Sequence, residues 1–192
     1  MLRSLSASIL AVAFLLAISA AAQENTWQID PNHSAAQFSV RHLGISTVRG
    51  AFTKVSGTVV YDPGNPSKAS LQATIDAASL DTRVEARDKD VKSANYLDVE
   101  KYPTITFKSK KVEAAGAGKL RITGDLTIHG VTKEVVLDVE GPSAAVKDPW
   151  GNQRMGASAT TTVNRMDYGV AGGKGMVGDD LSITLDIEMT HK

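Results

Sequence analysis

The chain has 192 residues, with 21 Lys and Arg residues balanced by 21 Asp and Glu residues, and it contains no cysteine. This balance gives no general electrostatic attraction to nucleic acid, so we expect no nucleic-acid partner, and the lack of cysteine excludes disulfides and thiol chemistry. The length is sufficient for one domain with a sizeable core.

The first segment has the features of a secretory signal peptide. Arg3 gives a basic start, an apolar run covers residues 9–18, and Ala20 and Ala22 form an A-x-A cleavage site. The apolar run is too short to cross a bilayer. We therefore expect residues 1–22 to be removed and residues 23–192 to form one domain that is periplasmic or secreted. The alternative is an uncleaved N-terminal anchor.

Most of the chain after residue 26 alternates between apolar and polar residues, which is the period of a half-buried strand. In "AQFSVRH" (36–42), Ala36, Phe38 and Val40 alternate with polar residues, and His42 ends the apolar row. Similar rows occur at 69–75, 105–107, 120–128, 135–139, 155–163 and 181–189. One apolar face and one polar face per strand are typical of an antiparallel sheet.

Irregularities and turns divide these segments into about eight strands. The first strand (27–43) contains Pro31, which predicts a kink, and the change of phase between Phe52 and Val55 predicts a bulge near Thr53 and Lys54. Turn sequences lie at 62–67, 114–118, 129–130 and 147–152. Eight is a common strand number for a small closed barrel, so we predict an all-β fold, an eight-stranded antiparallel barrel.

The segment "DTRVEARDKDVKSANYLDVEKYP" (81–103) is charged and does not alternate. Thr82 and Glu85 have the spacing of a capping box, and Val84 and Val91 lie on one helical face. We predict one helical insertion at about 82–97, with the helix near 83–93. The residues expected to pack it across the barrel are Val84, Val91, Tyr96 and Leu97.

A glycine-rich segment, "DYGVAGGKGMVGDD" (167–180), is expected to be either mobile or tightly turned. Long loops on small barrels often serve as mouths or lids, and a plain connection is the alternative. The segment lacks the G-x-x-x-x-G-K-[ST] spacing of a phosphate loop.

Few residues point to catalysis or to a metal. The chain contains no H-x-H or H-E-x-x-H motif, and His33 and His42 do not share a strand face, so we predict no metal site. His33 follows "DPN", which is typical of a turn residue bonded to Asp30 or to the backbone. The acidic residues lie mainly on polar rows or in the helix, and no G-x-S-x-G is present, so we expect a protein that is not an enzyme.

The apolar rows contain many small residues. They are Ala36, Ala69, Ala73, Gly124, Ala157 and Ala159. Small inward residues favour a barrel that holds an apolar ligand, and tight packing by the helix is the alternative.

Longer stretches of the chain resemble the YceI-like family, which consists of exported lipocalin-like proteins. These stretches are "WQIDPNHSAAQFSVRH" (27–42), "RGAF" (49–52), "TRVEARDKDVKSANYLDVEKYPTITFKS" (82–109), "GDLTIHGVTKEVVLDV" (124–139), "NRMDYG" (164–169) and "VGDDLSITLDIEM" (177–189). The resemblance implies a lipocalin-like barrel whose interior takes a long isoprenoid tail, as in a quinone or a prenyl lipid, and it implies no catalytic role. The chain has Asp90-Val91 where the family often has His-Leu.

We therefore expect an exported carrier of a polyisoprenoid or prenyl quinone, with no other cofactor and with transient membrane contact. The residues expected to bind this ligand are Phe38, Val40, His42, Phe52, Leu71, Ile75, Ile105, Phe107, Ile128 and Arg165.

Several alternatives remain open at this point. His42 either hydrogen-bonds a ligand head group or is a buried histidine satisfied by its neighbours. Arg87 and Arg165 are further head-group candidates, with an ion pair or a solvated surface position as the alternative. The whole chain could also be an outer-membrane β-barrel, or an enzyme directed at a lipid or a sugar.

Overall fold

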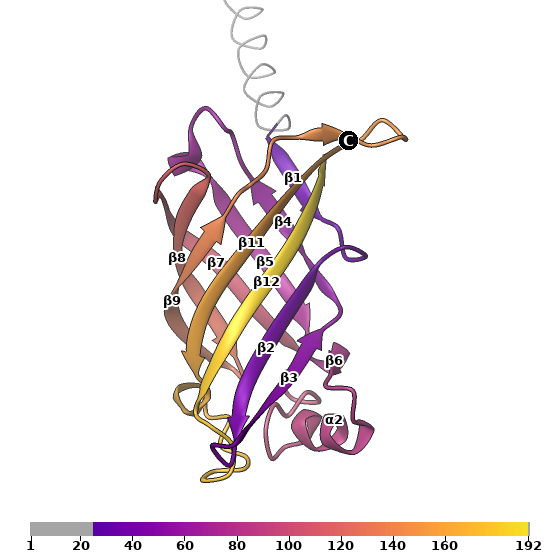
Figure 1. The fold of residues 1–192 in the computed structure, drawn as a ribbon, viewed down its shortest axis with the longest axis vertical. Helices are drawn as coiled ribbons and strands as arrows, with labels where there is room; N and C mark the ends of the chain where they lie inside the picture. Colours follow the sequence, from indigo (N-terminus) through magenta and orange to yellow (C-terminus); the bar gives the residue numbers. More distant parts are fainter. Residues whose placement is uncertain (1–24, 192) are drawn as a thin grey trace, which may run out of the picture.

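Eight antiparallel strands close into a barrel in the computed structural model, which describes residues 25–191 (Figure 1). The predicted signal peptide lies outside the described residues. Three of the strands are divided: β1 (Thr26–Ile29) continues as β2 (Ala35–His42), β3 (Ser46–Phe52) as β4 (Val55–Val60), and β5 (Ser70–Asp76) as β6 (Leu80–Asp81). The undivided strands are β7 (Thr104–Ala114), β8 (Lys119–Ile128), β9 (Val131–Glu140), β11 (Gln153–Asn164) and β12 (Asp180–His191).

The remaining elements are short. They are β10 (Val146–Lys147), the helix α2 (Glu85–Lys92), and three 3-10 helices at Pro66–Lys68, Ala77–Ser79 and Arg165–Tyr168. The helix α2 lies at one end of the barrel, the same end as the turn that joins β2 to β3 (Figure 1).

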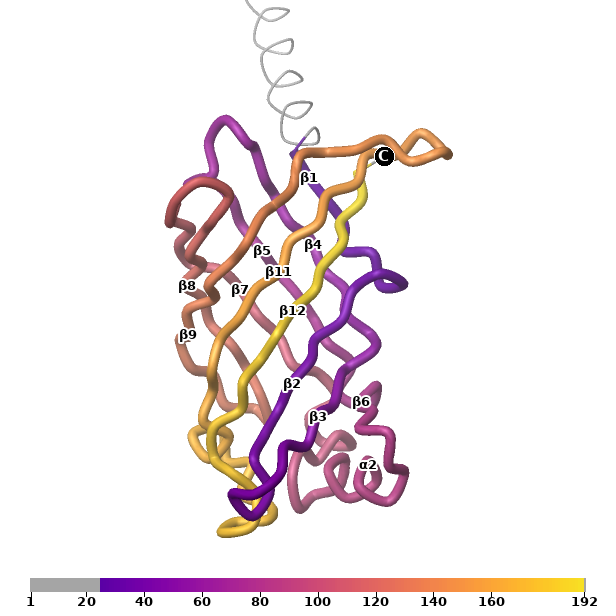
Figure 2. Tube along the Cα trace, in the orientation of Figure 1, coloured from indigo at the N-terminus to yellow at the C-terminus, as the bar shows by residue number. Residues whose placement is uncertain are grey.

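The barrel closes at β12. This strand pairs with β11 on one side and with both β1 and β2 on the other. The β11–β12 pairing runs without a register shift from Gln153–His191 to Asn164–Asp180. Figure 2 shows β11, β12 and β2 running side by side along the length of the barrel. The predicted eight-stranded antiparallel barrel is confirmed.

The two predicted irregularities in the first strands are also present. Pro31 lies between the end of β1 and the start of β2, and Thr53 and Lys54 separate β3 from β4. The structure adds two irregularities that the alternation did not predict: the 3-10 helix Ala77–Ser79 divides β5 from β6, and the register of β7 against β8 shifts between Ser109 and Lys111.

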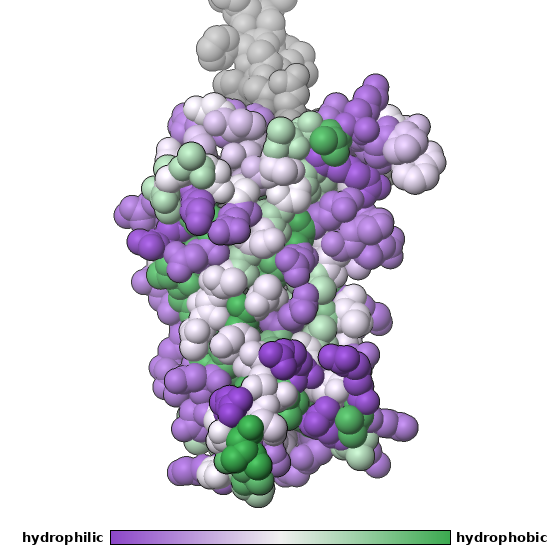
Figure 3. Space-filling view, viewed as in Figure 1, coloured by the Kyte–Doolittle hydropathy of each residue, from purple (hydrophilic) through white to green (hydrophobic). Residues whose placement is uncertain are grey.

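The apolar rows face the interior, and charged side chains cover the outside. Outward salt bridges join neighbouring strands, including Arg121 to Asp138 at 3.2 Å and Lys119 to Glu140 at 3.1 Å. Hydrophilic side chains cover most of the face seen in Figure 3. Alternation along each strand therefore separates an apolar interior from a polar exterior.

The start of α2 differs from the sequence prediction. The helix begins at Glu85 with Val84 in the cap position and no side-chain cap, so the predicted capping box of Thr82 and Glu85 is wrong. The physical reason is the positive φ of 64° at Arg83, which turns the chain away before the helix begins. Thr82 instead donates its backbone N–H and its hydroxyl to Asp88, whose pKa falls because these bonds outweigh the opposing effect of burial.

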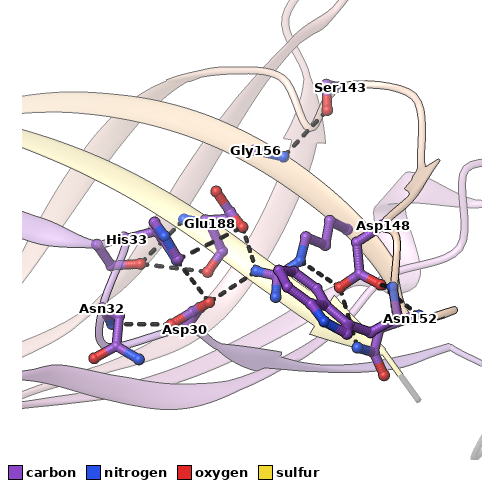
Figure 4. A network of polar contacts seen from close by, with 11 residues as sticks. Asp30, Asn32, His33, Ser143, Asp148, Asn152, Gly156 and Glu188 are labelled. Carbon is purple, nitrogen blue, oxygen red and sulfur yellow. Dashed lines mark hydrogen bonds and ion pairs between the residues drawn. The ribbon is translucent and has the colours of Figure 1, made fainter.

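An ionic network joins β1, β11 and β12 at the end of the barrel opposite α2 (Figure 4). Arg154 donates to Asp148 at 2.9 Å, to Asp30 at 2.8 Å and to Glu188. His33 Nδ1 forms a 2.9 Å hydrogen bond with Asp30, so the turn contact expected for His33 is confirmed.

This network also contains a grouping that the sequence did not predict. Asp30, His33 and Glu188 offer ligand atoms that all lie within 4.8 Å of one another. The guanidinium of Arg154 already bridges the two carboxylates, so the chain itself offsets part of their negative charge.

Two carboxylates of the network have low pKa values. The hydrogen bond from His33 is the main cause that holds the pKa of Asp30 at about 2, with Arg154 adding to it against the effect of burial. Burial disfavours the charged form of Asp148, but hydrogen bonds from Asn152 and Arg154 outweigh it and lower its pKa well below the ordinary value.

We predict that Asp30→Asn reduces the acid sensitivity of the fold. Because the pKa of Asp30 falls from 3.8 to about 2 on folding, its stabilisation is present above about pH 4 and is lost as the pH drops toward 2. Denaturant unfolding should show that the free energy of unfolding falls less steeply between about pH 4 and pH 2 in the variant. Equal slopes in the variant and the wild type would contradict this role of Asp30.

Candidate functional site

The barrel encloses a cavity of about 850 Å³. This volume lies within the range of about 300–1,000 Å³ that is typical of small-molecule sites. The wall is made by the inward rows of the strands, and all ten residues predicted to bind a ligand belong to it. These are Phe38, Val40, His42, Phe52, Leu71, Ile75, Ile105, Phe107, Ile128 and Arg165.

The cavity follows most of the length of the barrel. The inward residues of β12 from Leu181 to Met189 all line it. At about 3.3 Å per residue, this separation corresponds to roughly 26 Å along the strand. The cavity is therefore elongated and suits a long molecule better than a compact one.

The cavity opens at the α2 end, which we call the mouth. Most of the exposed residues in the cavity lining lie at this end. They are Ser46, Val84, Ala86, Asp90 and Met176. The other exposed lining residues, Gln37, Ser70 and Ser158, point outward from the barrel wall. At the other end, the lining residues Tyr61, Ala69, Pro142 and Met189 are buried or half-buried. The barrel is therefore open at one end.

The insertion that contains α2 forms part of the mouth. Leu97 is buried, and Val91 and Tyr96 are half-buried against the same cluster of apolar side chains, as predicted. Val84 differs from the prediction, because it is 46% exposed at the rim of the mouth. Its place in the cap position, outside the first turn of α2, accounts for this exposure.

Two inward phenylalanines lie close to the wall. A Cβ added at Gly50 would come within 2.6 Å of Phe38 Cζ, and one added at Gly124 would overlap the ring of Phe107. Each ring therefore lies over a glycine, which allows an aromatic side chain to leave space in the middle of the barrel.

Polar groups gather at the mouth. His42 is half-buried in the cavity wall, and its imidazole makes no hydrogen bond with any other residue in 25–191. Arg87 donates Nε to the Thr82 hydroxyl and Nη2 to the Thr82 carbonyl, both at 2.8 Å, while its Nη1 has no partner within the described chain. His42 and Arg87 thus retain hydrogen-bonding capacity at the mouth.

Arg165 has a different environment from the other two candidates. It is 5% exposed and donates to the carbonyls of Val170, Gly172, Val177 and Gly178, with a fifth contact of 3.4 Å to Asp179. These five contacts engage the guanidinium at Nε, Nη1 and Nη2, and a guanidinium has five N–H donors. Arg165 holds the glycine-rich segment 167–180 in tight turns, one of the two forms that the sequence predicts for this segment.

Tyr168 forms part of the same wall. Its hydroxyl is buried and has no hydrogen-bond partner among the described residues. Burial disfavours the phenolate and raises the pKa of Tyr168.

Sequence reasoning missed several residues of the lining. Leu126, Ile183 and Leu185 follow the same alternation as the predicted residues, so the signal that could have found them was present. Met176 and Val177 come from the glycine-rich segment, which has no periodic pattern, and only the folded chain brings them to the cavity.

Within residues 25–191, no helix is long and apolar enough to cross a membrane.

Comparison with known proteins finds relatives over most of the chain. The YceI-like domain matches residues 27–189. A UPF0312 protein of Vibrio cholerae is 40% identical over 161 residues, which cover 83% of this chain and 85% of the relative. A UPF0312 protein of Pseudomonas syringae pv. tomato is 36% identical over 190 residues, which cover 99% of this chain and 96% of the relative.

Solved structures share the barrel. A YCEI protein of Campylobacter jejuni is 33% identical with a TM-score of 0.70, and the match covers 79% of this chain and 90% of that protein. BcnA of Burkholderia cenocepacia is 26% identical with a TM-score of 0.74, covering 83% and 98%. A polyisoprenoid binding domain from Saccharophagus degradans has the same fold at 15% identity, with a TM-score of 0.64 and coverage of 86% and 98%.

We predict that Arg165→Met destabilises the chain by about 3 kcal/mol or more, because it leaves the buried carbonyl of Val170 and the partly buried carbonyls of Gly172 and Val177 without this donor. Denaturant unfolding measures the loss. Arg49→Met is the matched control, since Arg49 is exposed and its side chain makes no ion pair or hydrogen bond within residues 25–191, and it should change stability by less than about 0.5 kcal/mol. Similar losses in both variants would contradict the structural role of Arg165.

Proposed function

Because the chain belongs to the YceI-like family, we propose that it is an exported carrier that holds a polyisoprenoid or a prenyl quinone inside its barrel. The observation that carries this proposal is the elongated apolar cavity of about 850 Å³ with a single mouth. Binding would be driven by removal of the isoprenoid tail from water, which contributes about 25 cal/mol per Å² of apolar surface.

The cost of the cavity supports a ligand inside it. Empty apolar volume in a protein core lowers stability, so a cavity of this size favours a ligand that fills it. The small residues and the phenylalanines that lie over glycines maintain this space. One protein of the same fold is a polyisoprenoid binding domain, which agrees with the ligand class proposed here.

The head group of the ligand would lie at the mouth, where His42 and Arg87 can donate hydrogen bonds. A few polar groups in an apolar pocket fix the orientation of a ligand. Asp90 adds a carboxylate to the same rim, at the position where the family often has histidine. Arg165 is not included in this role, because its donors are used by the chain.

The other two function classes fit the arrangement less well. The outward face carries salt bridges such as Arg121–Asp138 and Lys110–Glu134, and charged groups in contact with lipid tails are costly. We propose binding without turnover. The Thr82 hydroxyl donates to Asp88 and accepts from Arg87, and Thr82 is buried, so this hydroxyl–carboxylate contact fixes the start of α2 and does not present a free nucleophile.

We predict that Ala159→Phe blocks the cavity. Ala159 is buried in the wall, so a phenyl ring there occupies the space of the ligand, and prenyl quinone binding should weaken at least about tenfold. Thr160→Phe adds the same ring at the next, outward position of β11 and should leave binding unchanged. Co-elution of ubiquinone with each variant measures uptake. Equal uptake by both variants would contradict binding inside the barrel.

We predict that His42→Ala weakens binding of a prenyl quinone by about two- to tenfold, which corresponds to one hydrogen bond. Binding of squalene, an isoprenoid hydrocarbon without a polar head, should not change in the same variant. A loss of affinity for both ligands would indicate a packing role for His42, and no loss for either would remove His42 from the head-group site.

A further inference from the structure

Three exposed apolar side chains lie beside the mouth on two segments that a hydrogen bond joins, and we call them the apolar tip. They are Leu43 and Ile45 in the β2–β3 turn and Met176 in the glycine-rich segment, with exposed fractions of 54%, 80% and 55%. A 2.7 Å hydrogen bond from the Leu43 N–H to the Met176 carbonyl joins the two segments. Figure 3 shows hydrophobic side chains gathered at the lower end of the molecule, where Figure 1 places the β2–β3 turn.

The apolar tip is continuous with the cavity. Met176 itself lines the mouth, and so do His42 and Ser46, which flank Leu43 and Ile45 in the chain. Met176 therefore belongs both to the tip and to the cavity lining.

Hydrogen bonds hold the tip in place. Arg41 donates to the Gly44 carbonyl and to the Thr47 hydroxyl, both at 2.7 Å, and these bonds fix the β2–β3 turn. The bonds of Arg165 fix the segment that carries Met176. The exposed side chains thus project from a defined turn.

Both segments that carry the tip contain cations, and the acidic residue Asp179 follows directly after the second segment. Residues 41–50 and 170–178 contain Arg41, Arg49 and Lys174 but no Asp or Glu. Arg49 and Lys174 form no ion pair within the described part of the chain. Apolar side chains at a tip with cations behind them are the pattern of an interfacial membrane contact with anionic lipid.

We infer that the apolar tip inserts into the surface of a bilayer that contains anionic lipids and places the mouth against the membrane. This inference rests on the proposed function, because an isoprenoid ligand could then pass between bilayer and cavity without crossing water. A tip of three side chains is too small for a stable protein interface, which buries about 800 Å² on each partner. A bilayer needs no such area, since each side chain can insert separately.

Vesicle sedimentation tests the inference with delipidated protein and phosphatidylcholine vesicles, with and without phosphatidylglycerol. Leu43→Asn combined with Ile45→Gln should reduce binding to the anionic vesicles at least about tenfold. Asparagine is suitable at residue 43 because Leu43 has a φ of 51°. Trp150→Gln is the matched control: Trp150 is 80% exposed, as Ile45 is, but lies beyond β10 at the opposite end of the barrel, and its loss should leave binding unchanged.

Arg49→Gln combined with Lys174→Gln tests the charges around the tip. It should lower the preference for phosphatidylglycerol, and an unchanged preference would overturn the anionic part of the inference.

Uptake of ubiquinone from ethanol dilution separates this inference from the proposed function. The Leu43→Asn, Ile45→Gln variant should take up ubiquinone from solution as the wild type does, but extract it from vesicles at least about tenfold more slowly. Three results would overturn the inference. The wild type does not bind vesicles, the Trp150→Gln control loses as much vesicle binding as the tip variant, or the wild type self-associates through the tip. Failure of the wild type to take up ubiquinone from solution would instead overturn the proposed function.

Discussion

The alternation of apolar and polar residues along strands that close into a ring is the constraint on which the rest of the structure depends. Because successive side chains point to opposite faces, a slip of one residue in the pairing of β11 with β12 would turn every apolar side chain of one strand outward. The unbroken register from Gln153–His191 to Asn164–Asp180 prevents this slip along the seam where the barrel closes. The cavity exists because the same rule holds for all eight strands.

The size of the inward residues then decides what the ring encloses. Alanines and glycines in the rows leave room, and the rings of Phe38 and Phe107 lie over glycines in the wall. His42 and Arg87 reach the cavity at the end beside α2. One chain thus provides an apolar channel, a polar mouth and an apolar tip beside that mouth, which together suit a carrier that exchanges its ligand at a membrane.

The sequence predicted the features that depend on neighbours in the chain. Alternation predicted the strands and the inward residues, and Pro31 and the change of phase after Phe52 predicted where two strands break. Contacts between distant residues were beyond this reasoning. Asp88 replaces Glu85 as the partner of Thr82 because of the backbone at Arg83, and Arg165 serves the carbonyls of a loop rather than a ligand. The ring of contacts around Arg154 likewise joins residues more than 100 positions apart.

The most direct test of a ligand inside this barrel is organic extraction of the protein, expressed from the full 192-residue sequence and purified, followed by mass spectrometry. The account predicts that the extract contains an isoprenoid lipid in an amount comparable to that of the protein, and that the emptied protein takes up a prenyl quinone. An extract free of such lipid, from protein that also fails to bind the quinone, would contradict it.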